Sequence, residues 1–561
     1  MMSNAKAQTA CFILLGLSQF FVPYVCSLSY TGRTGTVSKP KKCVVIGAGW
    51  GGLSTAHAIS KSSKEDWEVT VIDAATRPGG LVRDGFKSTS GERNAEAGQH
   101  GFWDCYANIY SLLFDDLKLP DNEILSQYAE QGQYSPRGLE AVWPIYRDQL
   151  KLPTGLGQAL FTRFLNLPPT DIASAWPLVL AFSEFDDSDE AWKKYDEVSF
   201  RDLCVKLGVS KRCYDEAFEP MILTGLFAPG RECSAAAALG MAYFFVLRSQ
   251  TAFDVRWCRG NIGEKIFDPW VDQMKGNGVE FMPSTRVIGF HPVEGQDTIQ
   301  SIECVNVADG TTSTLEADCV VFAVGANALN TFVSKSPFLA RYPDFTKFSN
   351  LRGTSVLATR LYFDKVIPTT YSANACWGFD DGVGMTFFDI KKIHGDDAPA
   401  VKGTQGSVIE VDFYHADPLI VLNDDEIISR VKSYLDKMLG NRSKDANVLD
   451  AAIVRLPKGV NWYFPGSYAS MPSIKSTSLS NVYFAGDIVR SRHGSWSQEK
   501  AYVTGIEAAN AILGRNGDEG IIQLEADEPH VNAGRIASSA FRSLLGGGDA
   551  SKGPSLVDFL W

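Results

Sequence analysis

Short apolar runs that end in glycine recur along the chain and predict buried strands. The run Cys43 to Ile46 precedes "GAGWGG", and a helical pattern continues from Leu53 to Ile59. A second run, "WEVTVIDA", also reads as a strand, and "VYFAGD" near the C-terminus precedes a long helical pattern, "WSQEKAYVTGIEAANAI". Strands that alternate with helices in this way predict an α/β fold.

Two other stretches, residues 155–182 and 234–247, are apolar and aromatic with few charges. They are either ordinary buried helices, or they form the walls of a hydrophobic tunnel together with a surface that rests on a membrane. Neither run reaches the length of a membrane span. Residues 516–561 read as a tail, in which "GRIASSAFRSLLGG" is either a short amphipathic surface helix or part of a disordered segment.

Residues 1–40 predict a targeting presequence rather than part of the fold. The apolar stretch "ACFILLGLSQFFVPYVCSLSY" is typical of a signal sequence, and "TGRTGTVSKPKK" after it is basic and free of acid. The first acidic residue of the chain is Glu65. This two-part leader resembles a plastid presequence of algae with complex plastids. Plain secretion or a membrane anchor is the alternative, and the sequon Asn441-Arg442-Ser443 would fit secretion.

Composition narrows the possible partners. The chain has 561 residues, 45% of them hydrophobic, which is enough for a large core and for connected domains. The net charge of −12, without basic runs, argues against a nucleic-acid partner. The eleven cysteines are scattered singly, without metal-ligand spacing, so we expect reduced, packed thiols and no metal site.

The glycine motif after the first predicted strand has the spacing G-x-G-x-x-G. Gly47 would make the tight turn from strand to helix, Gly49 would let the backbone approach a pyrophosphate, and Gly52 would allow close packing of helix on strand. Asp73 ends the second strand, where a carboxylate accepts ribose hydroxyls in dinucleotide-binding folds. NAD and FAD both use this fingerprint.

The stretch "ATRPGGLV" favours FAD over NAD as the cofactor. Arg77, Gly79 and Gly80 form an R-x-G-G motif that resembles the second glycine motif of the FAD-dependent amine oxidase superfamily. Paired glycines allow the backbone to lie against the diphosphate, and Arg77 can bond to phosphate. The superfamily usually has Arg or Lys at the next position, where this chain has Leu81.

The resemblance extends to the C-terminal Gly-Asp pair. In the superfamily the last strand of the FAD domain ends in Gly-Asp, which implies that Gly486 and Asp487 meet the ribityl chain. The helix that follows would aim its N-terminus, with Ser497 and Gln498, at the flavin. "GVEFMPSTRVIGF" resembles the strand pair in which the backbone of Val287 would meet the adenine.

The resemblance implies a discontinuous Rossmann-like FAD-binding domain of the glutathione-reductase type, a mixed-sheet substrate domain and a helical lobe. The expected segments are the presequence 1–40, FAD-binding segments 41–115, 256–350 and 471–515, a helical substrate or membrane lobe 116–255, a substrate domain 351–470 and the tail 516–561.

Within the superfamily, "EAGQHGFWDCYANIYSLLFDDL" is similar to a segment of plant and cyanobacterial carotene desaturases. His100 in this segment is either a proton carrier or flavin neighbour, or a structural histidine. His493 and Trp496 are likewise either neighbours of the flavin or purely structural residues. Gln498 and Glu499 either reach the flavin pyrimidine edge or simply open the helix.

The resemblance implies desaturation of a long apolar polyene by hydride transfer to flavin N5, with a quinone or O2 as electron acceptor and peripheral contact with a membrane. Three alternatives stay open: a redox-neutral carotenoid isomerase, an amine or porphyrinogen oxidase, and a flavin-bearing subunit of a photosynthetic membrane complex.

Overall fold

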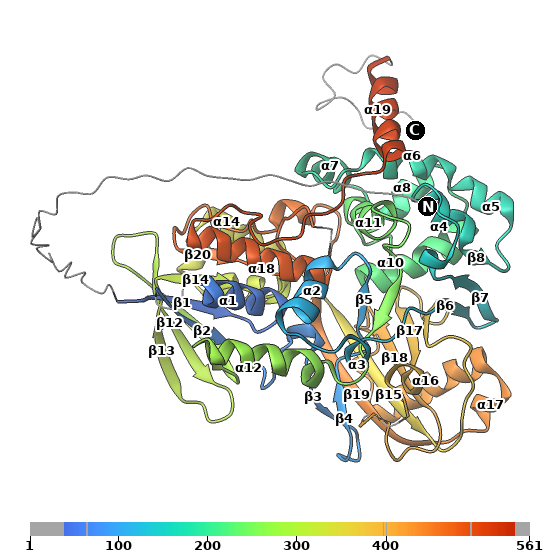
Figure 1. Cartoon of the computed structure of the whole chain (residues 1–561), viewed down its shortest axis with the longest axis horizontal. Helices are drawn as coiled ribbons and strands as arrows, with labels where there is room; N and C mark the ends of the chain where they lie inside the picture. The colour runs from blue at the N-terminus through green and yellow to red at the C-terminus, as the bar shows by residue number, and fades with distance from the viewer. Residues whose placement is uncertain (1–38, 63–65, 397, 400, 494–495, 545–561) are drawn as a thin grey trace, which may run out of the picture. The chain divides into compact units, whose positions relative to one another are not determined.

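A computed structural model of the chain describes residues 39–62, 66–396, 398–399, 401–493 and 496–544. The predicted presequence therefore lies outside the described residues, apart from its last two positions. The elements below belong to one compact unit, residues 40–561. The predicted α/β fold class is confirmed by this architecture (Figure 1).

A five-stranded parallel sheet carries the dinucleotide motifs. Its strand order is β10 (Glu280–Met282), β2 (Trp67–Ile72), β1 (Lys41–Ile46), β14 (Cys319–Phe322) and β20 (Val482–Phe484). The chain reaches β2 on one side of β1 and β14 on the other, so the strand order reverses at β1. In open α/β sheets, ligands bind outside the carboxyl ends of the strands at such a reversal.

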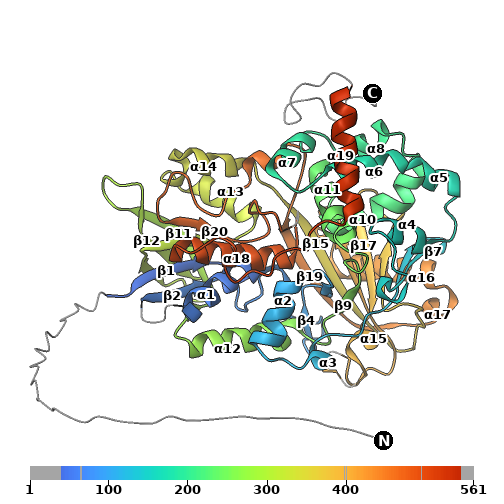
Figure 2. The ribbon, with the colours of Figure 1, turned by 45° about the horizontal axis from the view of Figure 1, so that its top comes forward.

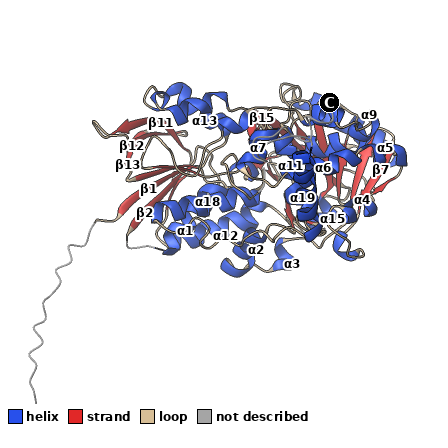
Figure 3. Cartoon of the chain, turned by 90° about the horizontal axis from the view of Figure 1, so that it is seen from above, coloured by secondary structure: helices blue, strands red, loops and turns tan. Residues whose placement is uncertain are grey.

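Helices and a small sheet cover the two faces of this sheet. On one face lie α1 (Trp50–Ser62), α12 (Asp268–Gly276) and α18 (Gln498–Leu513), and the other face carries an antiparallel sheet and α13 (Ala326–Lys335) (Figure 3). The antiparallel sheet consists of β11 (Thr285–Pro292), β12 (Ile299–Asn306) and β13 (Thr312–Glu316). Phe290 of the small sheet packs against Phe322 of β14, with ring centroids 5.4 Å apart.

A mixed eight-stranded sheet forms the second part of the unit. In spatial order its strands are β19 (Val448–Asn461), β15 (Gly353–Phe363), β18 (Val408–Tyr414), β17 (Gly384–Asp389), β16 (Ala373–Cys376), β6 (Gln131–Ser135), β7 (Gly138–Trp143) and β8 (Arg163–Phe164). Helix α16 (Asp424–Leu439) buries Ile427, Val431 and Leu435 against one face. Helices α15 (Ile390–His394) and α17 (Asn441–Lys444) flank the sheet.

Two short ribbons and three small helices join the sheets. They are β3 (Asp84–Lys87) with β4 (Asn94–Glu96), β5 (Gly101–Trp103) with β9 (Val255–Trp257), α2 (Ala107–Ser111), α3 (Asp121–Ile124) and α14 (Pro343–Thr346). The β5–β9 ribbon brings Gly101, after the second glycine motif, beside Trp257, much later in the chain.

The segment 116–255, predicted as a helical lobe, is not helical throughout. It contributes β6, β7 and β8 to the eight-stranded sheet, because β6 pairs in parallel with β16. Loops connect the α-helices of this segment, which after β7 are α4 (Leu156–Phe161), α5 (Pro169–Ser174), α6 (Trp176–Glu184), α7 (Asp189–Tyr195), α8 (Phe200–Lys206), α9 (Lys211–Cys213), α10 (Glu219–Leu226) and α11 (Ala235–Ala242).

The predicted tail contains the surface helix that the sequence offered as one interpretation. Helix α19 (Pro529–Leu544) lies against α6 (Figure 2). The residues before it are fastened to the body of the protein, since the backbone of Ile522 exchanges two hydrogen bonds with the Asn108 side chain. Asp527 also accepts a hydrogen bond from the Tyr243 hydroxyl, 2.8 Å away.

Candidate functional site

The first glycine motif lies at the carboxyl edge of the parallel sheet. The Gly47 N–H donates to the Ile72 carbonyl at 2.8 Å, so the turn sits between β1 and β2. Gly47 has a φ of +112°, and a Cβ there would lie 2.3 Å from the Ala323 carbonyl oxygen of the neighbouring β14 segment. Only glycine fits this turn. Helix α1 starts directly after it, so its unpaired N–H groups point into the crevice.

The two glycine motifs touch each other. The Gly79 N–H donates to the Ala48 carbonyl at 2.8 Å, and a Cβ on Gly80 would lie 3.0 Å from the Gly49 Cα. The two motifs therefore meet backbone to backbone at this point. These features fit the diphosphate of a dinucleotide, which needs close backbone approach.

Asp73 lies at the end of β2 beside this wall. Its carboxylate accepts hydrogen bonds from the N–H groups of Ala48 at 2.8 Å and Ala75 at 2.7 Å, while burial raises its pKa. The Asp73 carbonyl accepts from the Thr285 N–H at 2.7 Å, which brings the start of β11 and the buried Val287 to the same edge. The structure thus gathers Asp73 and Val287, and their contacts with ribose and adenine stay predictions.

Arg77 of the second motif and Arg83, which follows the motif, have different surroundings. Arg77 Nε and Nη2 are paired with Asp84 and Asp268, each at 2.8 Å, so these donors are engaged within the protein. Arg83 Nη1 donates to the Gly80 carbonyl at 2.9 Å, and burial lowers its pKa against the charge of Asp73. Arg83 is therefore a second candidate for the predicted phosphate contact, beside Arg77. The sequence analysis missed Arg83 because the superfamily motif has its basic residue at the position of Leu81, two residues earlier.

We expect Arg83→Gln to weaken FAD binding about tenfold, because a hydrogen bond from a charged group contributes roughly 1.5–3 kcal/mol. The stability of the FAD-free protein should change little, since Arg83 has no carboxylate partner among the ion pairs of the described residues. Titration of the FAD-free protein, followed by flavin fluorescence, measures the effect. Arg442→Gln on the exposed face of α17 is the matched control, and equal affinity of the two variants would contradict the role of Arg83.

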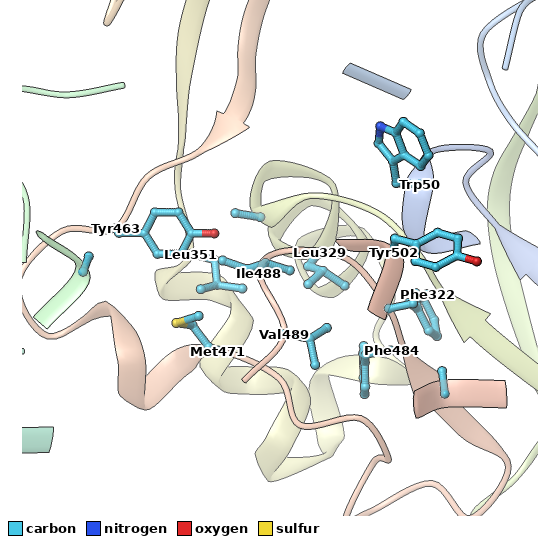
Figure 4. Close-up of a cluster of buried hydrophobic side chains, with 14 of the residues drawn as sticks. Trp50, Phe322, Leu329, Leu351, Tyr463, Met471, Phe484, Ile488, Val489 and Tyr502 are labelled. Atoms are coloured by element: carbon cyan, nitrogen blue, oxygen red, sulfur yellow. The ribbon is translucent and has the colours of Figure 1, made fainter. Parts of the chain in front are cut away.

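Gly486 and Asp487 meet the glycine motif from the other end of the chain. A Cβ on Gly51 would lie 2.7 Å from the Gly486 nitrogen, so the last strand and α1 are in contact. Gly486 has a φ of +121°, and a Cβ there would meet nothing within 4 Å, which leaves open space beside Asp487 for a ligand. Ile488 and Val489, the next two residues, anchor this loop in the core among Leu329, Leu351 and Met471 (Figure 4).

Two residues that the sequence interpretation missed orient Asp487. Asn461 Nδ2 donates to Asp487 Oδ1 at 2.8 Å, and the Tyr463 hydroxyl donates to the Asp487 carbonyl at 3.1 Å. The Asn461 side-chain oxygen in turn accepts from the Ala326 N–H at 2.7 Å. The only local signal is an Asn followed by aromatic residues at the end of a strand, which identifies no partner.

The start of α18 is fixed by its own side chains. Ser497 caps the helix, because its hydroxyl accepts from the Lys500 N–H at 2.9 Å. Gln498 accepts from the Trp50 indole and donates to the Gly101 carbonyl, both at 2.9 Å. Glu499 caps α2 instead, accepting from the Ile109 N–H at 3.0 Å, and burial raises its pKa to about 7. The helix N-terminus is therefore held rigidly at the crevice.

Beside Gln498 lies an apolar pocket of about 240 Å³. Among the described residues that line it, none carries a charged side chain. The aromatic members are Trp103, Tyr106, Trp143, Phe245, Phe253, Trp257, Phe388, Tyr414 and Trp496. The pocket therefore suits an apolar ligand, held next to the rigid helix start.

His100 lines this pocket, and burial together with the charge of Arg360 lowers its pKa to about 3. It is neutral at physiological pH and is a poor proton acceptor, so its place beside the pocket fits a flavin neighbour better than a proton carrier. Trp496 also lines the pocket. His493 is buried with a pKa lowered to about 4, and its role as a flavin neighbour stays a prediction.

A profile of the family described as flavin containing amine oxidoreductase matches residues 50–513. The 15-cis-phytoene desaturase of Arabidopsis thaliana is 24% identical over 499 residues, which cover 85% of this chain and 80% of the relative. The zeta-carotene desaturase of Synechocystis is 21% identical, covering 84% of this chain and 97% of the relative.

Solved structures share the fold. Putrescine oxidase aligns with a TM-score of 0.59 at 17% identity, covering 85% of this chain and 99% of that enzyme. An oxidoreductase from Methanosarcina mazei aligns with a TM-score of 0.55 at 14% identity, covering 84% and 100% of the two chains.

Proposed function

Because the chain belongs to the flavin containing amine oxidoreductase family, we propose that it desaturates a long apolar polyene of the carotenoid type. Family membership makes the protein an FAD-dependent oxidoreductase. The crevice at β1, the touching glycine motifs and the open space beside Asp487 fit that cofactor. The observation that carries the choice of substrate is the uncharged aromatic pocket at the start of α18.

The pocket lining argues for a polyene over an amine or a porphyrinogen. An anionic porphyrinogen would find no charged partner among the described lining residues, and a cationic amine would be held by aromatic faces alone, without a carboxylate. A volume of about 240 Å³ is below the roughly 300–1,000 Å³ of pockets that enclose whole small ligands. The pocket would therefore hold the reacting segment of a long chain, while the remainder extends toward the surface.

Exposed apolar side chains near the pocket wall support this arrangement. Trp143 in the pocket wall packs against Phe164, with centroids 6.2 Å apart, and the next residue, Leu165, is 53% exposed. Further exposed apolar side chains lie on neighbouring elements of the lobe. The exposed apolar side chains of the lobe and of α19, called the apolar face below, are Leu150, Leu156, Leu160, Leu165, Ile172, Trp176, Val179, Val205 and Ile536. We propose that it rests on a lipid bilayer from which the polyene enters.

The chain's own residues supply alignment and charge stabilisation. FAD, when bound, accepts a hydride from an allylic C–H group of the polyene. The N-terminus of α18, capped by Ser497 and tied down through Gln498, directs its positive end at the crevice, where it stabilises the negative charge that reduction brings. The aromatic walls exclude water and hold the polyene in a fixed orientation.

The test is anaerobic mixing of the FAD-loaded protein with carotenoids in liposomes while the flavin absorbance is followed. Bleaching that depends on the polyene and is reversed by a quinone is the expected result. Flavin that stays oxidised with every polyene overturns the proposal. Isomerised product that forms only after chemical pre-reduction would identify the redox-neutral isomerase instead.

Binding to vesicles should depend on the apolar face. Leu160 and Trp176 are 63% and 70% exposed, and full burial of such a side chain contributes about 1.5–3 kcal/mol. We expect Leu160→Ser with Trp176→Ser to weaken sedimentation with phosphatidylcholine vesicles at least about tenfold. Val421→Ser, at a position 78% exposed beside α16, is the matched control. Loss of binding in the control alone would place the contact elsewhere.

Within the described residues, no helix combines the length and apolar character needed to cross a bilayer.

We also propose a plastid location and a quinone or O2 as electron acceptor. The plant relatives are chloroplastic or chromoplastic proteins, and the two-part leader in residues 1–40 resembles a plastid presequence. A fusion of these residues to a fluorescent protein distinguishes plastid import from secretion. Steady-state oxygen consumption, compared with quinone reduction, identifies the acceptor.

A further inference from the structure

A polar cavity of about 760 Å³ lies apart from the apolar pocket, and the described linings of the two have no residue in common. Its lining also contains neither the glycine motifs nor Asp73 or Asp487 of the crevice. The turn between β3 and β4, α3, the loop that follows β9, β15 and α15 all contribute to its walls. The volume lies within the roughly 300–1,000 Å³ of sites that enclose small ligands. The cavity can therefore hold a ligand other than FAD or a polyene.

The walls of this cavity carry hydrogen-bonding and charged side chains. The described lining includes three amides and three carboxylates, which belong to Asn94, Asn122, Asn261, Glu92, Glu123 and Glu264. It also includes the cations Arg93, Arg259, Lys265, Arg360 and Lys402. Amide and carboxylate oxygens accept hydrogen bonds from hydroxyl groups, whereas guanidinium and ammonium groups bind phosphate. The lining thus combines partners for a sugar with partners for a phosphate.

Arg259 and Lys265 have no carboxylate partner among the described residues. Two other arginines of the lining are paired with carboxylates inside the protein. Arg259 Nη1 donates instead to the neutral Asn122 carbonyl at 2.7 Å. The aliphatic stem of Lys265 lies beside Gly260, where a Cβ would be 3.1 Å from the Lys265 Cε. The charges of Arg259 and Lys265 are therefore available to an anionic ligand.

The positive charges converge on His394 of α15. This histidine lines the cavity and is only 5% exposed. Burial lowers the pKa of its ring, and the charges of Arg360, Arg259 and Lys265 lower it further, so all three cations lie close to the ring. The carboxylates of the lining belong to exposed residues, whose charges are screened by water and salt. The inner part of the cavity is therefore its positive part.

The same ring has an unmatched hydrogen-bond acceptor. His394 Nε2 lies 3.0 Å from Gln99 Oε1, and because an amide oxygen only accepts, Nε2 carries the hydrogen. Gln99 Nε2 donates to the Cys258 carbonyl at 3.0 Å, which fixes the orientation of the amide. His394 Nδ1 is then a buried acceptor without a partner among the described residues. A hydroxyl group of a bound ligand would supply the missing hydrogen.

We propose that this cavity binds a phosphorylated sugar, either free or as part of a nucleotide. Arg259 and Lys265 bind the phosphate, and the amides and carboxylates of the walls accept hydrogen bonds from the sugar hydroxyls. A metal ion is a poorer candidate, because no group of three or more ligating side chains among the described residues could hold one. The proposal is independent of the desaturation, since it uses no residue that lines the crevice or the apolar pocket.

Calorimetric titration of the FAD-loaded full chain with ribose 5-phosphate tests the site. Bound FAD fills the crevice, which could otherwise take the phosphate. We expect saturable binding that Lys265→Gln and Arg259→Gln each weaken about tenfold, because each removes a hydrogen bond from a charged group. Lys275→Gln, at a position 55% exposed on α12, is the matched control and should bind like the wild type. Absence of binding to the wild type, or equal affinity of all three variants, overturns the proposal.

Three further probes identify the ligand chemistry in the same titration. Inorganic phosphate and ribose should each bind at least about tenfold more weakly than ribose 5-phosphate, because each lacks half of the partners. Equal affinity for phosphate overturns the sugar half of the proposal, and equal affinity for ribose overturns the phosphate half. AMP adds a base to the same sugar phosphate. Tighter binding of AMP supports a nucleotide, and weaker binding supports a free sugar phosphate.

Hydrogen exchange locates the binding site without any substitution. Ribose 5-phosphate should slow amide exchange in residues 259–265 and 390–394 of the FAD-loaded wild type. Protection confined to the glycine motifs or to α18 would place the ligand in the crevice and overturn the proposal. A failure of every polyene to bleach the flavin would leave this result unchanged, so the desaturation and the sugar-phosphate site are decided separately.

Discussion

Arg360→Met is expected to lower the free energy of unfolding by about 3–5 kcal/mol, because it leaves buried carboxylates without their cation. The side chain of Arg360 is 4% exposed, and those of its partners Glu96 and Glu410 are 2% and 1% exposed. Removal of one member of such a group costs far more than loss of a surface ion pair, which contributes about 0–1 kcal/mol. Chemical unfolding followed by tryptophan fluorescence measures the difference.

The loss should depend on pH with a definite sign. The pKa of Glu96 is raised from 4.5 to about 7 in the folded protein, so the folded state binds more protons than the unfolded state between these values. Its contribution to stability is complete below about pH 4.5 and is lost as the pH rises through about 7. Without Arg360 the carboxyl groups hold their protons more strongly, so the deficit should be larger at pH 8 than at pH 5. Arg430→Met, which removes a 2.9 Å pair with Asp380 at the surface, is the control. A deficit no larger than that of the control would mean that the carboxyl groups are neutral in the native protein.

Gly505→Ala should cost about 3 kcal/mol, the upper end of the usual range for overpacking, and reduce the FAD content, because α18 crosses α1 at this glycine. A Cβ there would lie 2.3 Å from the Gly51 carbonyl oxygen and 1.8 Å from the Ser54 hydroxyl. The hydroxyl can rotate away, but the carbonyl belongs to the helix that carries the glycine motif. The two helices must therefore separate, and Gly51 moves away from Gly486.

Alanine is the better helix former by about 1 kcal/mol, so the same change elsewhere should stabilise the protein. Gly276→Ala at the end of α12 is the matched control, since a Cβ there would meet nothing within 4 Å. Thermal unfolding midpoints and the flavin-to-protein absorbance ratio after gel filtration give both effects. A Gly505→Ala protein that retains full flavin and a normal midpoint would show that the helices adapt to the methyl group.

Local patterns predicted the parts of the site that local geometry determines. Gly47 and Gly486 mark turns with positive φ, and each follows a short apolar run, so glycine spacing and strand pattern agree at both positions. For Ser497 the sequence indicates a place at the flavin-facing helix start, and the structure adds that its hydroxyl caps the helix. The resemblance then joined these segments into one cofactor-binding region.

The sequence could not reveal features that depend on distant partners. The alternation in "VIEVDFY" shows that the two faces of the strand differ, but a polar face reads as solvent-exposed unless its partner is known. Glu410 and Asp412 are buried because residues 96–100 lie against them. Asn461 ends β19, and Asp487 follows β20, so the two residues belong to different strands. β6 to β8 join a sheet whose other strands begin only at Gly353.

The dispersal of the cofactor-binding segments also constrains biosynthesis. β1 is among the first folded residues to leave the ribosome, whereas β20 begins only at Val482 and α18 ends at Leu513. Gly51 cannot meet Gly486 until nearly the whole chain has been made, so FAD has no complete site on a nascent chain. The half-built sheet, with the edge of β14 unpaired, must be kept from aggregating until β20 arrives. Flavin supply should therefore affect the yield of the protein after synthesis rather than during it.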